Sequence, residues 1–77
     1  MILFWASSKD AVKGDSFEEV VNAMRLEHTG GALLTNKQYM KIIADRVFKL
    51  LGLIVDTRKE RYFVAELLRI GVLQYGQ

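Results

Sequence analysis

The sequence predicts a mainly α-helical fold, a compact three-helix domain, formed by a single domain over residues 1–77. Three observations lead to this prediction. Three Ser or Thr residues are each followed three positions later by Glu or Gln and then by apolar residues at helical spacing, a pattern typical of helix starts. The chain contains no proline, and glycines stand where the helices would end. A chain of 77 residues has room for only one core.

The first predicted helix covers residues 17–28. Ser16 and Glu19 form its capping box, and Gly30-Gly31 ends it, because glycine tolerates the left-handed conformation that follows a helix. The apolar residues that share one face are Phe17, Val20, Val21 and Met24.

The second predicted helix covers residues 36–51, with Thr35 and Gln38 as its capping box and Gly52 after its last turn. Its helical spacing predicts a buried arc of Tyr39, Met40, Ile43, Val47, Leu50 and Leu51.

The third predicted helix covers residues 58–70, with Thr57 and Glu60 as its capping box and Gly71 at its end. We expect its core side to consist of Phe63, Val64, Leu67, Leu68 and Ile70.

Three short apolar segments have the composition of strands: residues 2–6, 53–55 and 72–75. The first and last could pair as a small β-ribbon that joins the N-terminal and C-terminal segments. A two-stranded ribbon is marginal alone, so it would have to pack on the helices.

Composition limits the classes of function. Of the residues, 51% are hydrophobic and 26% charged, and Cys is absent, so neither disulfides nor thiolate metal sites are available. The first residues lack a basic segment typical of a secretory signal, and no apolar run approaches the roughly 20 residues that span a bilayer. We therefore expect a cytoplasmic protein that does not use a membrane.

The stretch DTRKERYF, residues 56–63, carries the candidate nucleic-acid surface. A net charge of +2 is too small for binding through charge alone, so only clustered basic residues would be effective. A helical wheel places Arg58, Arg61 and Arg69 in one stripe with Tyr62 at its edge. Lys37 and Lys41 could position phosphates from the second helix. The alternative reading is an ordinary solvated helix face.

A long second helix followed by Gly52 and a third helix suggests a helix-turn-helix motif, with the third helix as the recognition helix. The connecting segment LGLIVDT is longer and more apolar than the usual turn, which weakens this hypothesis.

Three large apolar residues are candidates for a protein interface. Phe48 and Ile42 lie outside the buried arc of the second helix, on its polar side. Either the N-terminal segment with Trp5 covers them, which we expect, or a second chain does.

The sequence offers no catalytic, cofactor or metal site. His28 is the single histidine, and a position at a helix C-terminus explains it. The sequence therefore predicts a small non-enzymatic binding or regulatory module that acts through protein–protein contacts, as a homodimer in its simplest form. The alternative is a small nucleic-acid-binding regulator that uses the basic face of the third helix.

Overall fold

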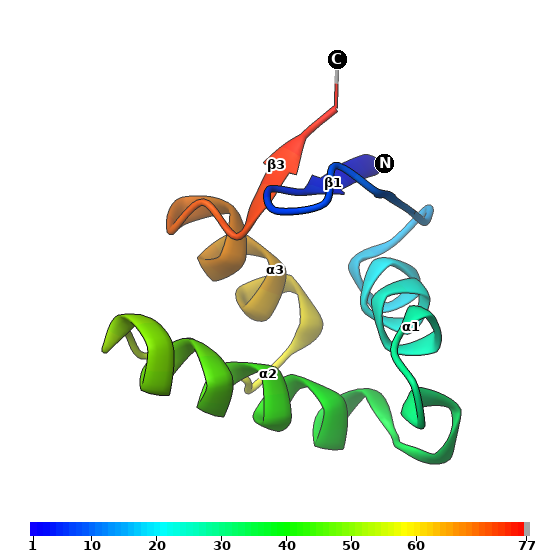
Figure 1. The fold of residues 1–77 in the computed structure, drawn as a ribbon. Coiled ribbons are helices and arrows are strands. Elements are labelled where there is room, and N and C mark those ends of the chain that lie inside the picture. Colours follow the sequence, from blue (N-terminus) through cyan, green and yellow to red (C-terminus); the bar gives the residue numbers. More distant parts are fainter. Residues whose placement is uncertain (77) are drawn as a thin grey trace.

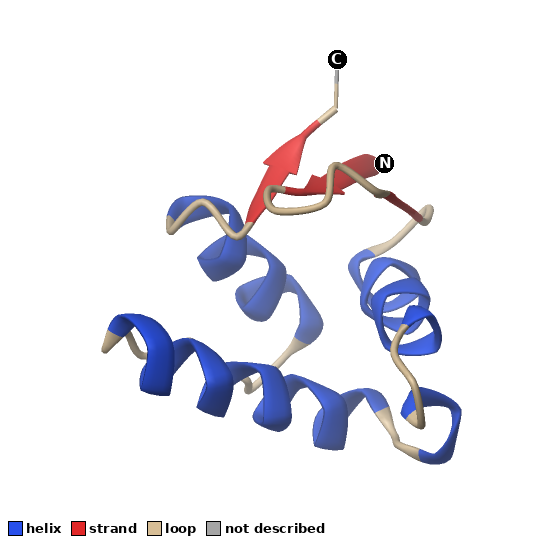
Figure 2. Cartoon of the chain, in the orientation of Figure 1, coloured by secondary structure: helices blue, strands red, loops and turns tan. Residues whose placement is uncertain are grey.

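A computed structural model gives the fold and describes residues 1–76 (Figure 1). Its elements in chain order are β1 (Ile2–Trp5), β2 (Ala11–Lys13), α1 (Phe17–Glu27), the 3-10 turn η1 (Gly31–Leu33), α2 (Asn36–Leu51), α3 (Glu60–Arg69) and β3 (Leu73–Tyr75). The prediction of three helices is confirmed. Figure 2 shows that the strands gather at one end of the molecule.

The small sheet has three antiparallel strands in the order β2-β1-β3. Pairing of the two terminal segments is confirmed, with Leu3 opposite Tyr75 and Trp5 opposite Leu73. The strand β2 was not predicted, and residues 53–55, predicted as a strand, do not form one. The hairpin between β1 and β2 closes through Lys9, which adopts a left-handed φ of 65°.

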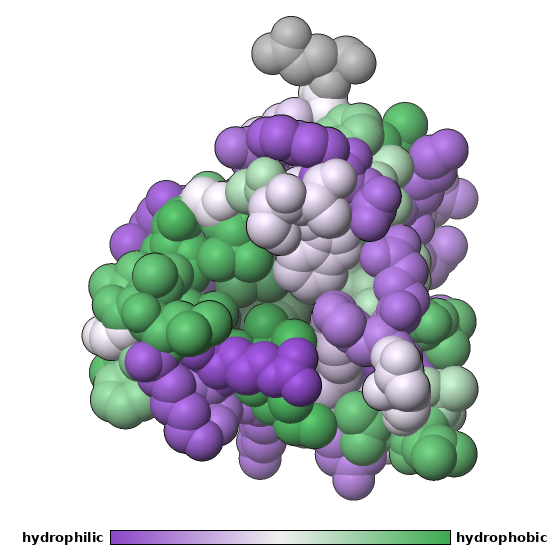
Figure 3. All heavy atoms as spheres, viewed as in Figure 1, coloured by the Kyte–Doolittle hydropathy of each residue, from purple (hydrophilic) through white to green (hydrophobic). Residues whose placement is uncertain are grey.

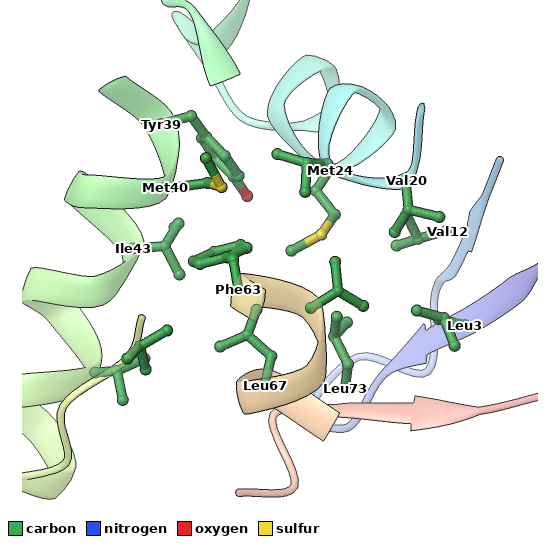
Figure 4. Packing of buried hydrophobic residues seen from close by; sticks show 14 residues of the cluster. Leu3, Val12, Val20, Met24, Tyr39, Met40, Ile43, Phe63, Leu67 and Leu73 are labelled. Carbon is green, nitrogen blue, oxygen red and sulfur yellow. The ribbon is translucent and has the colours of Figure 1, made fainter. Parts of the chain in front are cut away.

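The helices α1 and α3 form a middle layer between the sheet and α2 (Figure 1). The strand β2 packs on α1 and β3 packs on α3, while α2 crosses the opposite side of both helices. Phe63 lies at the centre of this arrangement, between Met24 of α1 and Ile43 of α2 (Figure 4). The core is continuous across the layers and consists of Leu3, Val12, Val20, Val21, Met24, Tyr39, Met40, Ile43, Val47, Val55, Phe63, Val64, Leu67 and Leu73.

Two of the three predicted caps are formed. The Ser16 hydroxyl accepts from the amide of Glu19 at 3.2 Å. Thr35 and Gln38 form both hydrogen bonds of the capping box, at 3.1 Å and 2.9 Å.

The predicted cap at Thr57 is wrong, because α3 begins two residues later than expected and its N-cap, Lys59, makes no side-chain cap. A turn explains the shift, since the Asp56 carboxylate accepts from the amide of Arg58 at 2.9 Å. The carboxylate of Glu60 accepts instead from the side-chain amide of Asn36 at 3.3 Å, which ties α3 to α2.

The connector of residues 52–59 runs back along α2 instead of turning directly into α3. Lys37, near the start of α2, donates from Nζ to the carbonyl oxygen of Thr57 at 3.1 Å. Val55 anchors the connector because its side chain is buried in the core. The chain therefore enters α3 beside the N-terminal end of α2. The tight turn of a helix-turn-helix motif is not formed.

Within residues 1–76, every helix is too short or too polar to cross a bilayer.

Candidate functional site

A cluster of exposed apolar side chains marks the C-terminal end of α2. We call it the α2-end patch, and its residues with their exposed fractions are Phe48 (55%), Leu50 (82%), Leu51 (55%), Leu53 (39%) and Ile54 (78%). Figure 3 shows hydrophobic atoms gathered on the side of the molecule where the C-terminal ends of α2 and α3 lie. Exposed apolar side chains gathered at one end of a molecule are typical of an interaction site.

The prediction that Leu50 and Leu51 are buried is wrong. Leu50 continues the helical arc of Tyr39, Ile43 and Val47, which are buried as predicted. The last turn of α2 extends beyond the neighbouring elements in Figure 1, and the two leucines that it carries, Leu50 and Leu51, are 82% and 55% exposed.

The α2-end patch is free of charge at its centre. Residues 50–55 contain no ionisable side chain. The nearest basic residue in the helix, Lys49, forms an ion pair of 2.9 Å with Asp45 one turn earlier. A partner for this surface must therefore be apolar as well.

The three residues predicted as a protein interface are not brought together. The N-terminal segment does not cover Phe48 or Ile42, which are 55% and 40% exposed, so that expectation is wrong. The reason is the sheet, which directs Trp5 to the end of α1 instead of to α2. Phe48 belongs to the α2-end patch, while Ile42 lines a small cavity of about 130 Å³ beside Tyr39.

Trp5 belongs to a second site, which includes the one histidine. Its indole Nε1 donates to Oε2 of Glu27 at 3.2 Å, and its ring meets the His28 ring edge-on at 5.6 Å. Nδ1 of His28 lies 2.8 Å from the hydroxyl of Tyr39. Burial raises the pKa of Tyr39 far above its usual value, so this hydroxyl stays protonated. The site was not predicted because its residues come from separate parts of the chain.

Two of the basic residues around α3, Arg58 and Arg61, lie against the ring of Tyr62, although Arg58 precedes the helix. The guanidinium groups of Arg58 and Arg61 lie 5.0 Å and 4.8 Å from the centre of the Tyr62 ring. Arg61 also donates to the Tyr62 hydroxyl at 2.9 Å, and this hydrogen bond lowers the pKa of Tyr62. Arg58 is ion-paired with Asp56 at 2.7 Å, and its hydrogen bonds lower the pKa of that carboxyl.

The remaining basic candidates do not join this group through side-chain contacts. Arg69 is ion-paired with Glu66 at 2.8 Å. Lys37 is hydrogen bonded to the connector at Thr57, and Lys41 is exposed on α2. Two of the three predicted arginines therefore have acidic partners, which reduces the charge available for phosphate.

A half-buried guanidinium, which the sequence did not reveal, joins α1, η1 and α2. Arg25 donates from Nη1 to the carbonyl oxygens of Gly31 and Leu34, at 2.9 Å and 2.8 Å, and from Nε to Oδ1 of Asn36 at 3.0 Å. It also donates to Asn22. These contacts tie the C-terminal half of α1 to η1 and to the start of α2.

In the part of the chain that the structure describes, no three His, Asp or Glu side chains lie close enough together to hold a metal ion. Comparisons with protein-family models, with curated proteins and with solved structures gave no match to this chain.

Proposed function

We propose that the protein is a non-enzymatic binding module that acts through protein–protein contacts, with a second copy of itself as its first partner. The single observation that carries this proposal is the α2-end patch, in which five large apolar side chains are exposed within residues 48–54. Exposed apolar surface costs free energy in water that contact with another chain would recover.

The chemistry of the patch supports a second copy as the partner. Because residues 50–55 carry no charge, no ionic pattern selects a different protein. A twofold contact pairs a surface with itself, and this surface is self-complementary in polarity.

The size of the patch also fits a dimer. Its five side chains expose roughly 600 Å² in each copy, if a large apolar side chain has an area of about 200 Å². If a partner covered all five side chains, two copies would together bury roughly 1,200 Å², which compares with about 1,000 Å² for a specific interface.

The experiment is sedimentation equilibrium over a range of concentrations for the wild type and two leucine variants. Leu50→Lys places a charge in the patch, while its matched control, Leu33→Lys, places the same charge at a leucine in η1 that is 90% exposed. Lysine is compatible with the C-terminal turn of α2, because a cation there is favoured by the helix dipole.

We expect the wild type and Leu33→Lys to dimerise with a Kd of about 10 µM or lower, and Leu50→Lys to remain monomeric. A wild type that is monomeric at about 1 mM would refute self-association. Binding of that monomer to neutral lipid vesicles, lost in Leu50→Lys, would instead assign the patch to a membrane surface.

A second candidate function is nucleic-acid binding, favoured by the packing of Arg58 and Arg61 against Tyr62. Arginine beside an aromatic ring can hold a phosphate and stack on a base. We rank it second because Arg58 and Arg69 are ion-paired within the chain. Salt-dependent binding of a mixed-sequence duplex that Arg61→Ala weakens would support it.

A further inference from the structure

A depression of about 680 Å³ opens between the β1–β2 hairpin and the C-terminal end of α1. Its walls come from three segments of the chain: the end of β1, the hairpin turn with the start of β2, and the last residues of α1. The residues that line it are Trp5, Ser7, Ser8, Asp10, Ala11, Glu27 and His28. None of them belongs to the α2-end patch, so the depression is a separate surface feature.

The aromatic side of the depression is fixed in place by hydrogen bonds. Trp5 is half-buried, lies at right angles to the His28 ring, with an interplanar angle of 81°, and donates to Glu27. The Tyr39 hydroxyl, which is buried, holds the other side of the His28 ring. The site therefore needs little ordering of these rings when a ligand arrives, which favours binding.

The polar side of the depression is acidic. Asp10 and Glu27 line it, and neither carboxylate forms an ion pair with any residue in the described part of the chain. Glu27 lies in the last turn of α1, where the helix dipole adds further negative potential. After burial itself, the charge of Glu27 is the next cause of the raised pKa of Tyr39. Basic residues also occur around the depression: Lys9 precedes Asp10 in the exposed hairpin turn, and Arg46 lines the smaller cavity that shares His28.

From this combination we propose that the depression is a binding site for an organic cation, an alkylammonium group that contacts the indole of Trp5 and is neutralised by Asp10 and Glu27. Tryptophan is the best aromatic partner for such cations, and nearby carboxylates raise the local concentration of positive charge. The hydroxyl groups of Ser7 and Ser8 could accept or donate hydrogen bonds to the polar part of the ligand. Because the site is open, we expect a Kd of about 1 mM.

The test uses the fluorescence of Trp5, which is the single tryptophan of the chain and lines the site. The wild type is titrated with choline at constant ionic strength, and in parallel with dimethylbutanol, the neutral tert-butyl isostere of choline. Two isosteric variants, Asp10→Asn and Glu27→Gln, remove the charges. The glutamine can still accept from the indole. Glu19→Gln, in the first turn of α1, is the matched control because it removes the same charge at the opposite end of the helix.

We expect a saturable response to choline that weakens at least about tenfold when both carboxylates are removed, and that Glu19→Gln leaves unchanged. An equal response to the neutral alcohol would overturn the proposal, because the depression would then recognise shape without charge. No saturation up to about 100 mM choline would also overturn it.

A further titration with N-acetyl-lysine methylamide separates two sources of the same chemistry. Tighter binding of the lysine derivative than of choline would identify the ligand as a basic side chain of a partner protein. Tighter binding of choline would identify it as a free small cation. Every titration is repeated with Leu50→Lys, and an unchanged response would show that binding in the depression is independent of self-association.

Discussion

Replacement of Gly31 by alanine tests whether the contact between α1 and the η1 turn supports the fold. Gly31 is buried, and a Cβ atom there would lie 1.7 Å from the carbonyl oxygen of Arg25. Both contacting segments are backbone, so no side chain can rotate out of the way. A tolerable contact of about 3.0 Å requires them to separate by about 1.3 Å, the difference between 3.0 Å and 1.7 Å.

That separation would break two hydrogen bonds of Gly31. Its amide donates to the carbonyl oxygen of His28 at 2.9 Å, and its carbonyl oxygen accepts from Arg25 at 2.9 Å. An ordinary hydrogen bond contributes about 1 kcal/mol and one to a charged group about 1.5–3 kcal/mol, so Gly31→Ala should cost about 2.5–4 kcal/mol. This is a large part of the roughly 4–12 kcal/mol expected for a chain of this length.

The assay is urea denaturation followed by far-ultraviolet circular dichroism, in the Leu50→Lys background so that a monomer unfolds. Gly52→Ala is the control, since Gly52 has a φ of +71° and open space around a Cβ atom. Its cost arises from backbone strain alone, about 1 kcal/mol. A loss for Gly31→Ala no greater than that for Gly52→Ala would refute the steric argument.

Two further predictions concern the starts of the helices and the charges before α3. Thr35→Ala should lower the free energy of unfolding by about 1 kcal/mol, while Thr57→Ala should change it by less than about 0.5 kcal/mol, because Thr57 caps no helix; the same urea assay compares them. Since Arg58 lowers the pKa of Asp56, the ionised carboxyl stabilises the fold above its unfolded pKa of about 3.9, and this stability is lost as pH falls through the folded pKa. The stability difference between the wild type and Asp56→Asn should therefore shrink between about pH 5 and pH 2, and a constant difference would contradict the assignment.

The helices could be predicted from the sequence because local signals specify them. The bounds of α2 agree with the prediction at both ends, where Thr35 and Gly52 supply the cap and the left-handed residue that a helix end needs. The start of α3 could not be predicted, because Asp56 competes with Thr57 by forming a local turn with Arg58. The strand β2 was not predicted because it has only three residues and buries one side chain, Val12. A segment of this length is too short to show the alternation of apolar and polar residues that marks a strand.

The candidate sites were only partly predictable, because two of them depend on how separate parts of the chain pack together. A helical wheel gives the direction of Leu50 but cannot show that the body of the domain stops before the last turn of α2. The pairing of Trp5 with His28 depends on the sheet, which carries the N-terminal strand to the end of α1. Arg58 and Arg61 lie within four positions of Tyr62 in the sequence. Their proximity to its ring could therefore be predicted from the sequence alone.

The last turn of α2 adds little to the core. Phe63 must lie between α1 and α2, so the chain has to return along α2 before α3 can begin, and Val55 anchors that return. A helix that ended after Val47 would bury the same side chains of α2, with a shorter connector and less exposed apolar surface. The extra turn therefore exposes Leu50 and Leu51 without a structural gain within one chain. Exposing these apolar side chains to water costs free energy, and they lie where they do not disturb the core. A contact with another chain would explain why they are there.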